Sequence, residues 1–163
     1  NVDRREVKVA RVVIASTRAA TGVYEDRCGP IIRNWFTDRG FSVTDPAVVP
    51  DGDAVRDALR TAVRQGAHVI VTSGGTGISP SDATPEATLS VIDYQIPGLA
   101  DAIRRAGLPA VPTAVLSRGV CGVVGQTLVI NLPGSVGGVR DGMRVLSDVL
   151  EHALDQLSGG DHG

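Results

Sequence analysis

Residues 71–86, which read VTSGGTGISPSDATPE, decide the fold of this chain. The short apolar run at residues 67–71 that leads into this stretch is typical of a buried strand. At the other end, Thr84 and Pro85 are typical of a helix start, with threonine as the N-cap and proline at the first helical position. The stretch therefore predicts a strand, a glycine-rich turn with one carboxylate, and a helix.

The turn inside this stretch has the composition of an anion-binding loop. Glycine permits positive φ angles and lets the backbone approach an anion closely. Amides of such a turn, next to a helix N-terminus, can hold a phosphate group. Asp82 lies at the mouth of the turn, where a metal ion could join its carboxylate to phosphate oxygens. The structural alternative is a tight turn capped by Asp82, because a short glycine motif is a weak signal alone.

Strands and helices alternate along the rest of the chain. Runs of apolar and β-branched residues predict strands at residues 7–15, 41–49, 67–73 and 127–131. The strand at 41–49 is expected to be interrupted at Pro46, and residues 115–118 and 120–124 predict a strand or hairpin. Amphipathic spacing predicts helices at residues 29–39, 53–65, 85–93, 99–106 and 139–157. This alternation predicts a three-layer α/β/α fold, with helices on both faces of a mostly parallel central sheet.

Length and composition limit the class of protein. The 163 residues most simply form one domain, 1–163, with a frayed tail over residues 158–163. A formal net charge of −2 disfavours a general nucleic-acid-binding protein, because the phosphate backbone attracts a basic surface. No apolar run approaches the roughly 20 residues of a membrane helix, and no apolar signal segment follows the first residues. We therefore expect a cytoplasmic protein without nucleic-acid or membrane partners.

Three absences exclude particular chemistries. Lys8 is the only lysine and lies in the first predicted strand, so a P-loop with Gly-Lys-Ser/Thr is absent and Schiff-base catalysis is disfavoured. Residues 16–22, which form the first predicted turn, lack the Gly-x-Gly-x-x-Gly of a dinucleotide-binding fold. Cys28 and Cys121 lack metal-ligand spacing, and we expect both to be buried free thiols.

The predicted topology gathers four loops at one edge of the sheet, where ligands bind in such folds: residues 16–18, 50–53, 74–82 and 133–138. Glycine turns after two different strands suggest two anionic groups held side by side. Asp51, a natural N-cap for the helix expected at 53–65, and Asp82 each follow a strand and could face one crevice. Two carboxylates near phosphates most simply bind Mg²⁺, an arrangement that suits phosphoryl or nucleotidyl transfer.

Two long motifs resemble the signature of the MogA/MoaB family of molybdenum-cofactor biosynthesis. The first runs from residues 72–77, TSGGTG, through residues 82–88, DATPEAT, and the second is VINLPGS at residues 129–135. Shorter matches occur at residues 22–26, 50–51, 96–98 and 116–118. The resemblance covers nearly the whole chain, roughly residues 8–157, and its two long motifs in the right order make it far more specific than one glycine turn.

The resemblance implies a molybdopterin adenylyltransferase. Such enzymes transfer AMP from Mg-ATP to the terminal phosphate of molybdopterin and release pyrophosphate. The adenylylated pterin then passes to a MoeA-type insertase, which uses it for molybdenum insertion. The same resemblance implies a homotrimer with the active-site edge of the sheet exposed to solvent.

The resemblance also implies roles for individual residues. Asp51 and Asp82 would be catalytic and would bind or orient Mg²⁺. Two phosphate sites would be lined by the two glycine turns, the first by Ser73, Gly74, Gly75, Thr76 and Gly77 and the second by Pro133, Gly134 and Ser135. Ser117 and Arg118 would lie near the pterin or its phosphate.

The chain departs from the commoner family pattern at three positions. Ser81 stands where many members carry arginine, Thr17 where many carry aspartate, and Val136 where many carry proline. The missing arginine removes one positive charge near the phosphates, so affinity or rate could differ. Asp51 and Asp82 themselves are unchanged.

Two alternatives to the adenylyltransferase remain open. One is a non-catalytic molybdopterin-binding or scaffold protein of the same pathway, which would bind the pterin without Mg-dependent loss of ATP. The other is a related domain that acts on other pterins or nucleotides, as in molybdenum-insertion and nucleotide-recycling proteins. Those domains usually accompany further domains, which we do not expect within 163 residues.

Overall fold

The computed structural model describes residues 7–159. Its strands are β1 (Val9–Ala15), β2 (Ser42–Val43), β3 (Ala47–Val49), β4 (Val69–Ser73), β5 (Tyr94–Gln95), β6 (Cys121–Val124) and β7 (Thr127–Leu132). Its α-helices are α1 (Thr17–Ala20), α2 (Cys28–Asp38), α3 (Asp53–Arg64), α4 (Thr84–Leu89), α5 (Pro97–Ala106), α6 (Val136–Ser147) and α7 (Leu150–Leu157). A 3₁₀-helix, η2 (Pro112–Leu116), precedes β6.

All seven strands belong to one sheet, in the order β2-β1-β4-β7-β6-β5, with β3 also paired to β1. The pairings of β1 with β2, β3 and β4, and of β4 with β7, are parallel. Within residues 7–159, the antiparallel pairings are the two made by β6, with β7 on one side and β5 on the other. The prediction of a mostly parallel sheet is therefore confirmed, and the antiparallel strands lie at one end of it.

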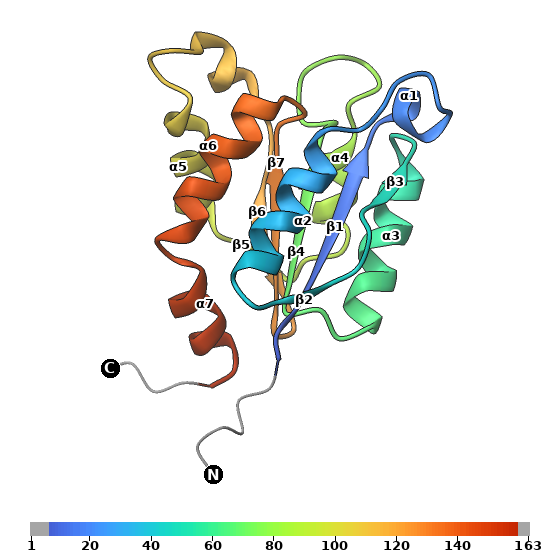
Figure 1. The fold of residues 1–163 in the computed structure, drawn as a ribbon. Coiled ribbons are helices and arrows are strands. Elements are labelled where there is room, and N and C mark those ends of the chain that lie inside the picture. Colours follow the sequence, from blue (N-terminus) through green and yellow to red (C-terminus); the bar gives the residue numbers. More distant parts are fainter. Residues whose placement is uncertain (1–6, 160–163) are drawn as a thin grey trace.

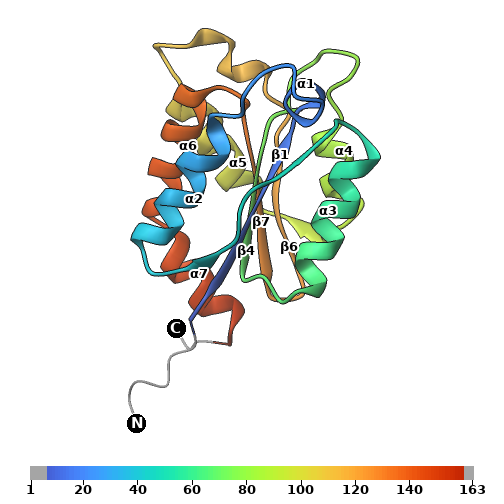
Figure 2. The same ribbon diagram turned by 45° about the vertical axis from the view of Figure 1, so that its right-hand side comes forward.

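Helices cover both faces of the sheet and give the predicted three layers (Figures 1 and 2). Helices α2, α5, α6 and α7 lie on one face, and α3 and α4 lie on the other. Alternate residues of each central strand enter the two cores: in β1, Val12 and Ile14 pack on one side, and Val13 and Ala15 on the other. Because both faces are buried, the strand reads as a continuous apolar run and not as an alternating one.

The interruption expected at Pro46 in the strand at residues 41–49 is confirmed. Two short strands, β2 and β3, lie on either side of Pro46, which has no amide to donate to the ladder. One predicted helix was wrong in its extent. The helix expected at 139–157 is divided into α6 and α7, with the Val149 amide bonded to the Leu146 carbonyl at the break. The apolar spacing continues through Leu146, Leu150 and Leu154, so the periodicity could not indicate this break.

Four local predictions were also wrong. The loop expected after β1 contains the short helix α1, and residues 115–116, expected in a strand or hairpin, belong to η2. Thr84 is not the N-cap of α4, because that position is Ala83. Asp51 is not the N-cap of α3, because Gly52 holds that position with φ +104°.

No helix within residues 7–159 has both the length and the apolar character needed to cross a bilayer. Helix α7 ends at Leu157, and Ser158 and Gly159 follow it. The rest of the tail expected at 158–163, and the first six residues, lie outside the described part of the chain.

One buried side chain joins the layers just below the edge of the sheet where the parallel strands end. The Asn131 amide nitrogen donates to the hydroxyls of Thr72 in β4 and Thr88 in α4, both at 3.0 Å. Its oxygen accepts from the backbone amide of Val120 at 3.1 Å. Because Asn131 is 3% exposed and both ends of its amide are bonded, it specifies how β4, β7 and α4 meet.

We predict that Asn131→Ala lowers the free energy of unfolding by about 2 to 3 kcal/mol, because buried polar groups on its three neighbours lose their partner. Urea denaturation followed by circular dichroism measures this change. The control is Asn34→Ala, which removes the same side chain from an exposed position of α2 and is expected to stay within about 0.5 kcal/mol of the wild type. Equal effects of the two substitutions would contradict the joining role of Asn131.

Candidate functional site

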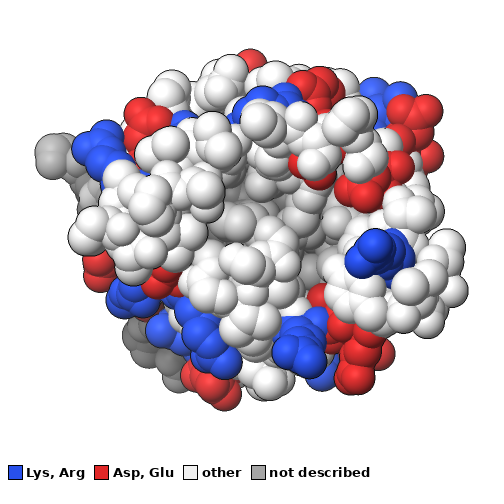
Figure 3. All heavy atoms as spheres, turned by 90° about the horizontal axis from the view of Figure 1, so that it is seen from above, with Lys and Arg blue, Asp and Glu red and all other residues white. Residues whose placement is uncertain are grey.

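The edge of the sheet at which the parallel strands end is hollowed (Figure 3). Viewed from this side, the hollow is lined mainly by uncharged residues, and acidic and basic residues lie around its rim. Two clefts open here: the first cleft has a volume of about 790 Å³ and the second cleft about 710 Å³. Gly75, Asp82 and Gly134 line both clefts, so they form a shared ridge between them.

The first cleft lies between the ends of β1 and β4 and the start of α2. Its polar lining includes Ser16, Thr17, Arg18, Asp26, Asp51, Ser73, Ser81 and Asp82. Asp51 and Asp82 thus share one cleft, although 30 positions separate them in the sequence. The prediction that both face one crevice is confirmed.

The second cleft lies on the other side of the ridge, under α5 and η2. Its lining is more apolar and includes Ile103, Val111, Ala114, Leu116 and Pro133, together with Thr76, Gly77, Arg104, Ser117, Ser135 and Asp141. Two adjoining clefts can hold two ligands whose reactive groups meet over the shared ridge.

Asp51 is held by Thr17, the second residue after the end of β1. The Asp51 amide donates to the Thr17 hydroxyl at 3.2 Å, and that hydroxyl donates to Asp51 Oδ2 at 3.3 Å. The other oxygen, Oδ1, is buried and has no hydrogen-bond partner within the described residues. Gly75 has φ +69°, and a Cβ atom there would overlap the Thr84 hydroxyl oxygen and lie 3.0 Å from this Asp51 oxygen, so glycine is favoured at this point of the ridge.

Asp82 closes the loop in which it lies. Its Oδ2 accepts from the Ser79 amide at 3.1 Å, while its own amide donates to the Ser79 carbonyl at 2.9 Å. The capping role considered for Asp82 from the sequence is therefore present. It does not replace a role in the site, because the same residue lines both clefts.

The two glycine turns are in direct contact. Ser73 donates its hydroxyl hydrogen to the Pro133 carbonyl at 2.8 Å, and the Gly74 amide donates to the Leu132 carbonyl at 3.0 Å. A Cβ atom on Gly134 would lie 3.3 Å from the Gly74 Cα. The turns that follow β4 and β7 therefore form one rigid surface, and the Ser73 hydroxyl is used in building it.

Most residues predicted to bind phosphate or pterin lie at these clefts. Ser73 and Gly74 line the first cleft, Thr76, Gly77, Ser117, Pro133 and Ser135 line the second, and Gly75 and Gly134 line both. Arg118 does not belong to the lining of either cleft. Its guanidinium instead bonds the loop that carries Asp82. Which ligand atoms these residues contact stays a prediction.

Thr17 was expected at the ligand edge only as part of the loop at residues 16–18, and two further residues of the site, Arg104 and Asp26, were not predicted from the sequence. Thr17 orients Asp51, so the departure from the family pattern at position 17 does touch an expected catalytic residue. Arg104 in α5 lines the second cleft and donates to the Gly119 carbonyl at 2.8 Å. Asp26 accepts from the amides of Cys28 and Gly29 at the start of α2. No sequence pattern singled out Arg104 or Asp26, whereas Thr17 belongs to the loop at residues 16–18 that follows a predicted strand.

Neither cysteine is prepared for nucleophilic chemistry. Both are free and buried, as predicted. Burial raises the pKa of the Cys28 thiol, which lines the first cleft, above its ordinary value. Burial raises the pKa of Cys121 to about 12. Both therefore stay protonated at neutral pH.

The acidic side chains suit a cation that is shared with a ligand. No cluster of three or more histidine, cysteine, aspartate or glutamate residues able to hold a metal ion occurs within residues 7–159. A cation at the first cleft would have the unpartnered Asp51 oxygen and the Asp82 carboxylate from the protein. Mg²⁺ fits such a site, because it commonly takes one or two carboxylates and fills its other positions with water and phosphate oxygens.

Comparison with known proteins gives consistent matches over most of the chain. A family model described as a probable molybdopterin binding domain matches residues 11–152. A solved structure of the molybdopterin biosynthesis Mog protein from Mycobacterium ulcerans superposes with a TM-score of 0.90 and 65% identity, covering 93% of this chain and 99% of that chain.

Curated sequences give similar matches. The chain is 34% identical over 144 residues to the molybdopterin adenylyltransferase of Escherichia coli K12, covering 84% of this chain and 72% of that protein. It is 38% identical over 155 residues to a molybdenum cofactor biosynthesis bifunctional protein of Synechococcus elongatus, covering 94% of this chain. The chain spans about half the length of the Synechococcus protein, 49%.

The close contact between the glycine turns and β1 gives a testable prediction. Gly74 has φ +96°, and a Cβ atom there would overlap the carbonyl oxygen of Ala15. Gly22 also has a positive φ, +80°, but a Cβ atom there would meet nothing within 4 Å. We expect Gly22→Ala to cost about 1 to 2 kcal/mol of unfolding free energy, from backbone strain alone.

Gly74→Ala should lower the free energy of unfolding by roughly 1 to 3 kcal/mol more than Gly22→Ala, because overlap with a backbone atom adds to the same backbone strain. Urea denaturation of the two variants in parallel measures the difference. Equal losses of stability would show that β1 does not constrain the turn.

Proposed function

We propose that this chain, which belongs to the MogA/MoaB family of molybdopterin-binding domains, is a molybdopterin adenylyltransferase. It would transfer AMP from ATP to the terminal phosphate of molybdopterin and release pyrophosphate. The observation that carries the proposal is the pair of clefts on either side of one ridge, with Asp82 and Gly75 lining both. This is the arrangement that a reaction between two phosphorylated substrates needs.

The reaction joins two anions and therefore needs positioning and charge compensation. An oxygen of the molybdopterin phosphate attacks the α-phosphorus of ATP and forms a new P–O bond. The bond from that phosphorus to the oxygen bridging the α- and β-phosphates breaks, and pyrophosphate leaves with the bonding electrons. Backbone amides of the two glycine turns can bind the phosphate oxygens and hold both substrates in line.

Magnesium is part of the proposal. When bound, it would neutralise phosphate charge and so lower the barrier to attack by a second anion. Asp51 and Asp82 would hold it. The support for this assignment is the buried Asp51 oxygen without a partner within the described residues, because an ionised carboxylate oxygen in that state is costly unless a cation binds it.

We extend the proposal to the setting of the reaction. The enzyme would work in the cytoplasm as a homotrimer and would pass the adenylylated pterin to a MoeA-type insertase. The relatives matched here include an adenylyltransferase and a longer bifunctional protein of the same pathway, which supports a place in molybdenum cofactor biosynthesis.

The direct test is a product assay. Purified protein is incubated with molybdopterin and Mg-ATP, and mass spectrometry is used to detect the AMP adduct and pyrophosphate. The expected result is adduct that forms only when both substrates and Mg²⁺ are present. Binding of molybdopterin without Mg-dependent ATP consumption would favour a non-catalytic scaffold, and ATP consumption only with a different pterin or nucleotide acceptor would favour a related domain of other specificity.

We predict that Asp82→Ala lowers the turnover of AMP transfer by at least about 100-fold, because a charged group that acts on the reacting phosphates is lost. Molybdopterin affinity should change by less than about threefold, since the loss concerns charge compensation and not pterin contacts. Wild-type turnover at saturating Mg-ATP would contradict this role.

Asp51→Asn preserves the size of the side chain but removes its charge, and should raise the half-saturating Mg²⁺ concentration about 10-fold or more. Asp53→Asn is the matched control, because Asp53 has an exposed side chain (88%) that pairs with Arg56 on α3. It should leave both turnover and the Mg²⁺ requirement unchanged. A similar shift in both variants would point to a general effect of surface charge and would remove Asp51 from the metal site.

A further inference from the structure

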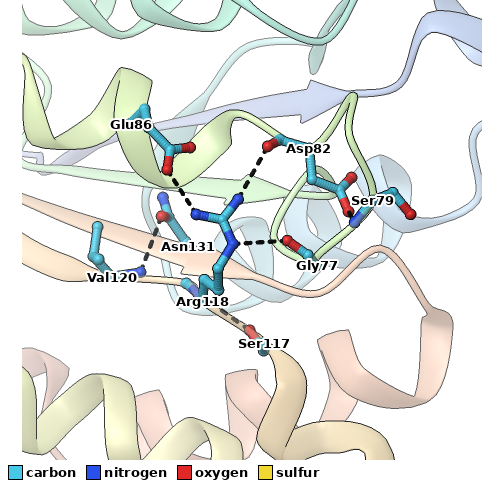
Figure 4. Close-up of polar contacts among 9 residues, drawn as sticks. Gly77, Ser79, Asp82, Glu86, Ser117, Arg118, Val120 and Asn131 are labelled. Atoms are coloured by element: carbon cyan, nitrogen blue, oxygen red, sulfur yellow. Dashed lines mark hydrogen bonds and ion pairs between the residues drawn. The ribbon is translucent and has the colours of Figure 1, made fainter.

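The side chain of Arg118 spans the loop that carries Asp82 (Figure 4). Its Nε donates to the Gly77 carbonyl at 2.9 Å, and its Nη2 donates to the Asp82 carbonyl at 3.0 Å. The backbone amide of Arg118 also donates to the Thr76 carbonyl at 2.7 Å. These bonds connect the two ends of the exposed segment 78–81 to one residue, Arg118.

Glu86 fixes the direction of the guanidinium. Its Oε2 accepts from Arg118 Nη1 at 2.6 Å, and this hydrogen bond lowers the pKa of the Glu86 carboxyl. The arginine charge is therefore paired at neutral pH with a residue of α4, the helix that follows the loop. All three guanidinium nitrogens donate to the loop or to α4.

The segment that carries Arg118 is itself anchored by residues of α5 and β7. Arg104 in α5 donates to the carbonyls of Ser117 at 3.3 Å and Gly119 at 2.8 Å. Asn131 bonds the amide of Val120 from β7. Because its own backbone is anchored on both sides, Arg118 can transmit a fixed position from the sheet to the loop.

We propose that Arg118 is a positioning residue that holds the Gly77–Asp82 loop, and with it the Asp82 carboxylate, in place at the ridge between the two clefts. It acts on the reacting groups through Asp82 and does not bind substrate phosphate itself. The inference rests on the proposed function for its kinetic part, whereas the position of the loop can be tested without activity.

The geometry favours positioning over direct phosphate binding. A phosphate-binding arginine presents two parallel N–H groups to the anion. Here one N–H from each terminal nitrogen is directed at a carboxylate or a carbonyl, and the residue lines neither cleft. A lysine at this position could pair with Glu86 but could not bridge two carbonyls in the same fixed geometry.

The test compares Arg118→Lys and Glu86→Gln with the control Arg56→Lys. Arg56 on α3 pairs only with the surface carboxylates of Asp53 and Asp57 in the described contacts, so this control loses a guanidinium elsewhere. Hydrogen–deuterium exchange of peptides covering residues 77–82 reports loop order. Calorimetry with inorganic pyrophosphate as the probe reports anion affinity, and steady-state assays separate kcat from KM.

Arg118→Lys should speed exchange in the loop at least about 10-fold and lower kcat about 10- to 100-fold, with KM and pyrophosphate affinity within about threefold of the wild type. Glu86→Gln should shift exchange and kcat in the same direction by a smaller factor, and Arg56→Lys should change neither. Unchanged loop exchange in Arg118→Lys, or weakened pyrophosphate binding with normal kcat, would overturn the proposal.

Two further results keep the tests independent. If the wild-type protein forms no AMP adduct, the proposed function fails, but faster loop exchange in Arg118→Lys would still support the positioning role. If Arg118→Lys does not fold, the Glu86→Gln variant tests the positioning role. This variant is expected to fold, because it replaces an exposed carboxylate of α4 with an amide that retains an acceptor oxygen. A folded Glu86→Gln variant whose loop exchanges at the wild-type rate would then count against the positioning role of Arg118.

Discussion

The site depends on direct backbone contact between two turns that follow neighbouring parallel strands. Strands β4 and β7 are adjacent and in register, so their turns emerge side by side. The bond from Ser73 to the Pro133 carbonyl, and the bond from the Gly74 amide to Leu132, then lock the turns together. Glycine is necessary at position 74, where φ is +96° and a Cβ atom would overlap the Ala15 carbonyl oxygen, whereas at position 134 a Cβ atom would make a tight contact of 3.3 Å with the Gly74 Cα.

Next to these joined turns, the carboxylates of Asp51 and Asp82 are held in different ways. Asp51 is oriented by Thr17 and retains one buried oxygen without a partner in the described chain, whereas Asp82 uses one of its oxygens to close its own loop. The first carboxylate therefore has a fixed orientation and one buried oxygen open to a partner, whereas the position of the second depends on how its loop is held. This difference explains why an arginine–glutamate pair is needed on the Asp82 side: the exposed segment 78–81 makes few contacts with the core.

Much of the architecture followed from periodicity and turn chemistry. Continuous apolar runs predicted the central strands correctly, and glycine turns after two of them predicted the ligand edge. The failures were local. The break between α6 and α7 at Asp148 and Val149 was not predicted because the apolar stripe runs through it. The cap assignments for Asp51 and Thr84 failed because neighbouring residues, Gly52 and Ala83, hold the N-cap positions. Arg118 was placed near the ligand by its motif, but no sequence pattern indicates where a long side chain ends.

The sequence by itself determined the layered parallel fold, the two glycine turns and the placement of Asp51 and Asp82 after strands, because these depend on local composition and on the spacing of apolar residues. Only the tertiary structure decided that the turns form one ridge, that this ridge separates two clefts, and that Asp51 rather than Asp82 keeps a buried oxygen without a partner among residues 7–159. These features arise between segments separated by tens of residues, such as Thr17 and Asp51 or Gly77 and Arg118. The geometry of these contacts is set by the order of the strands and the direction of the side chains. Strand pairing across the sheet fixes both, and the spacing of residues along the sequence does not.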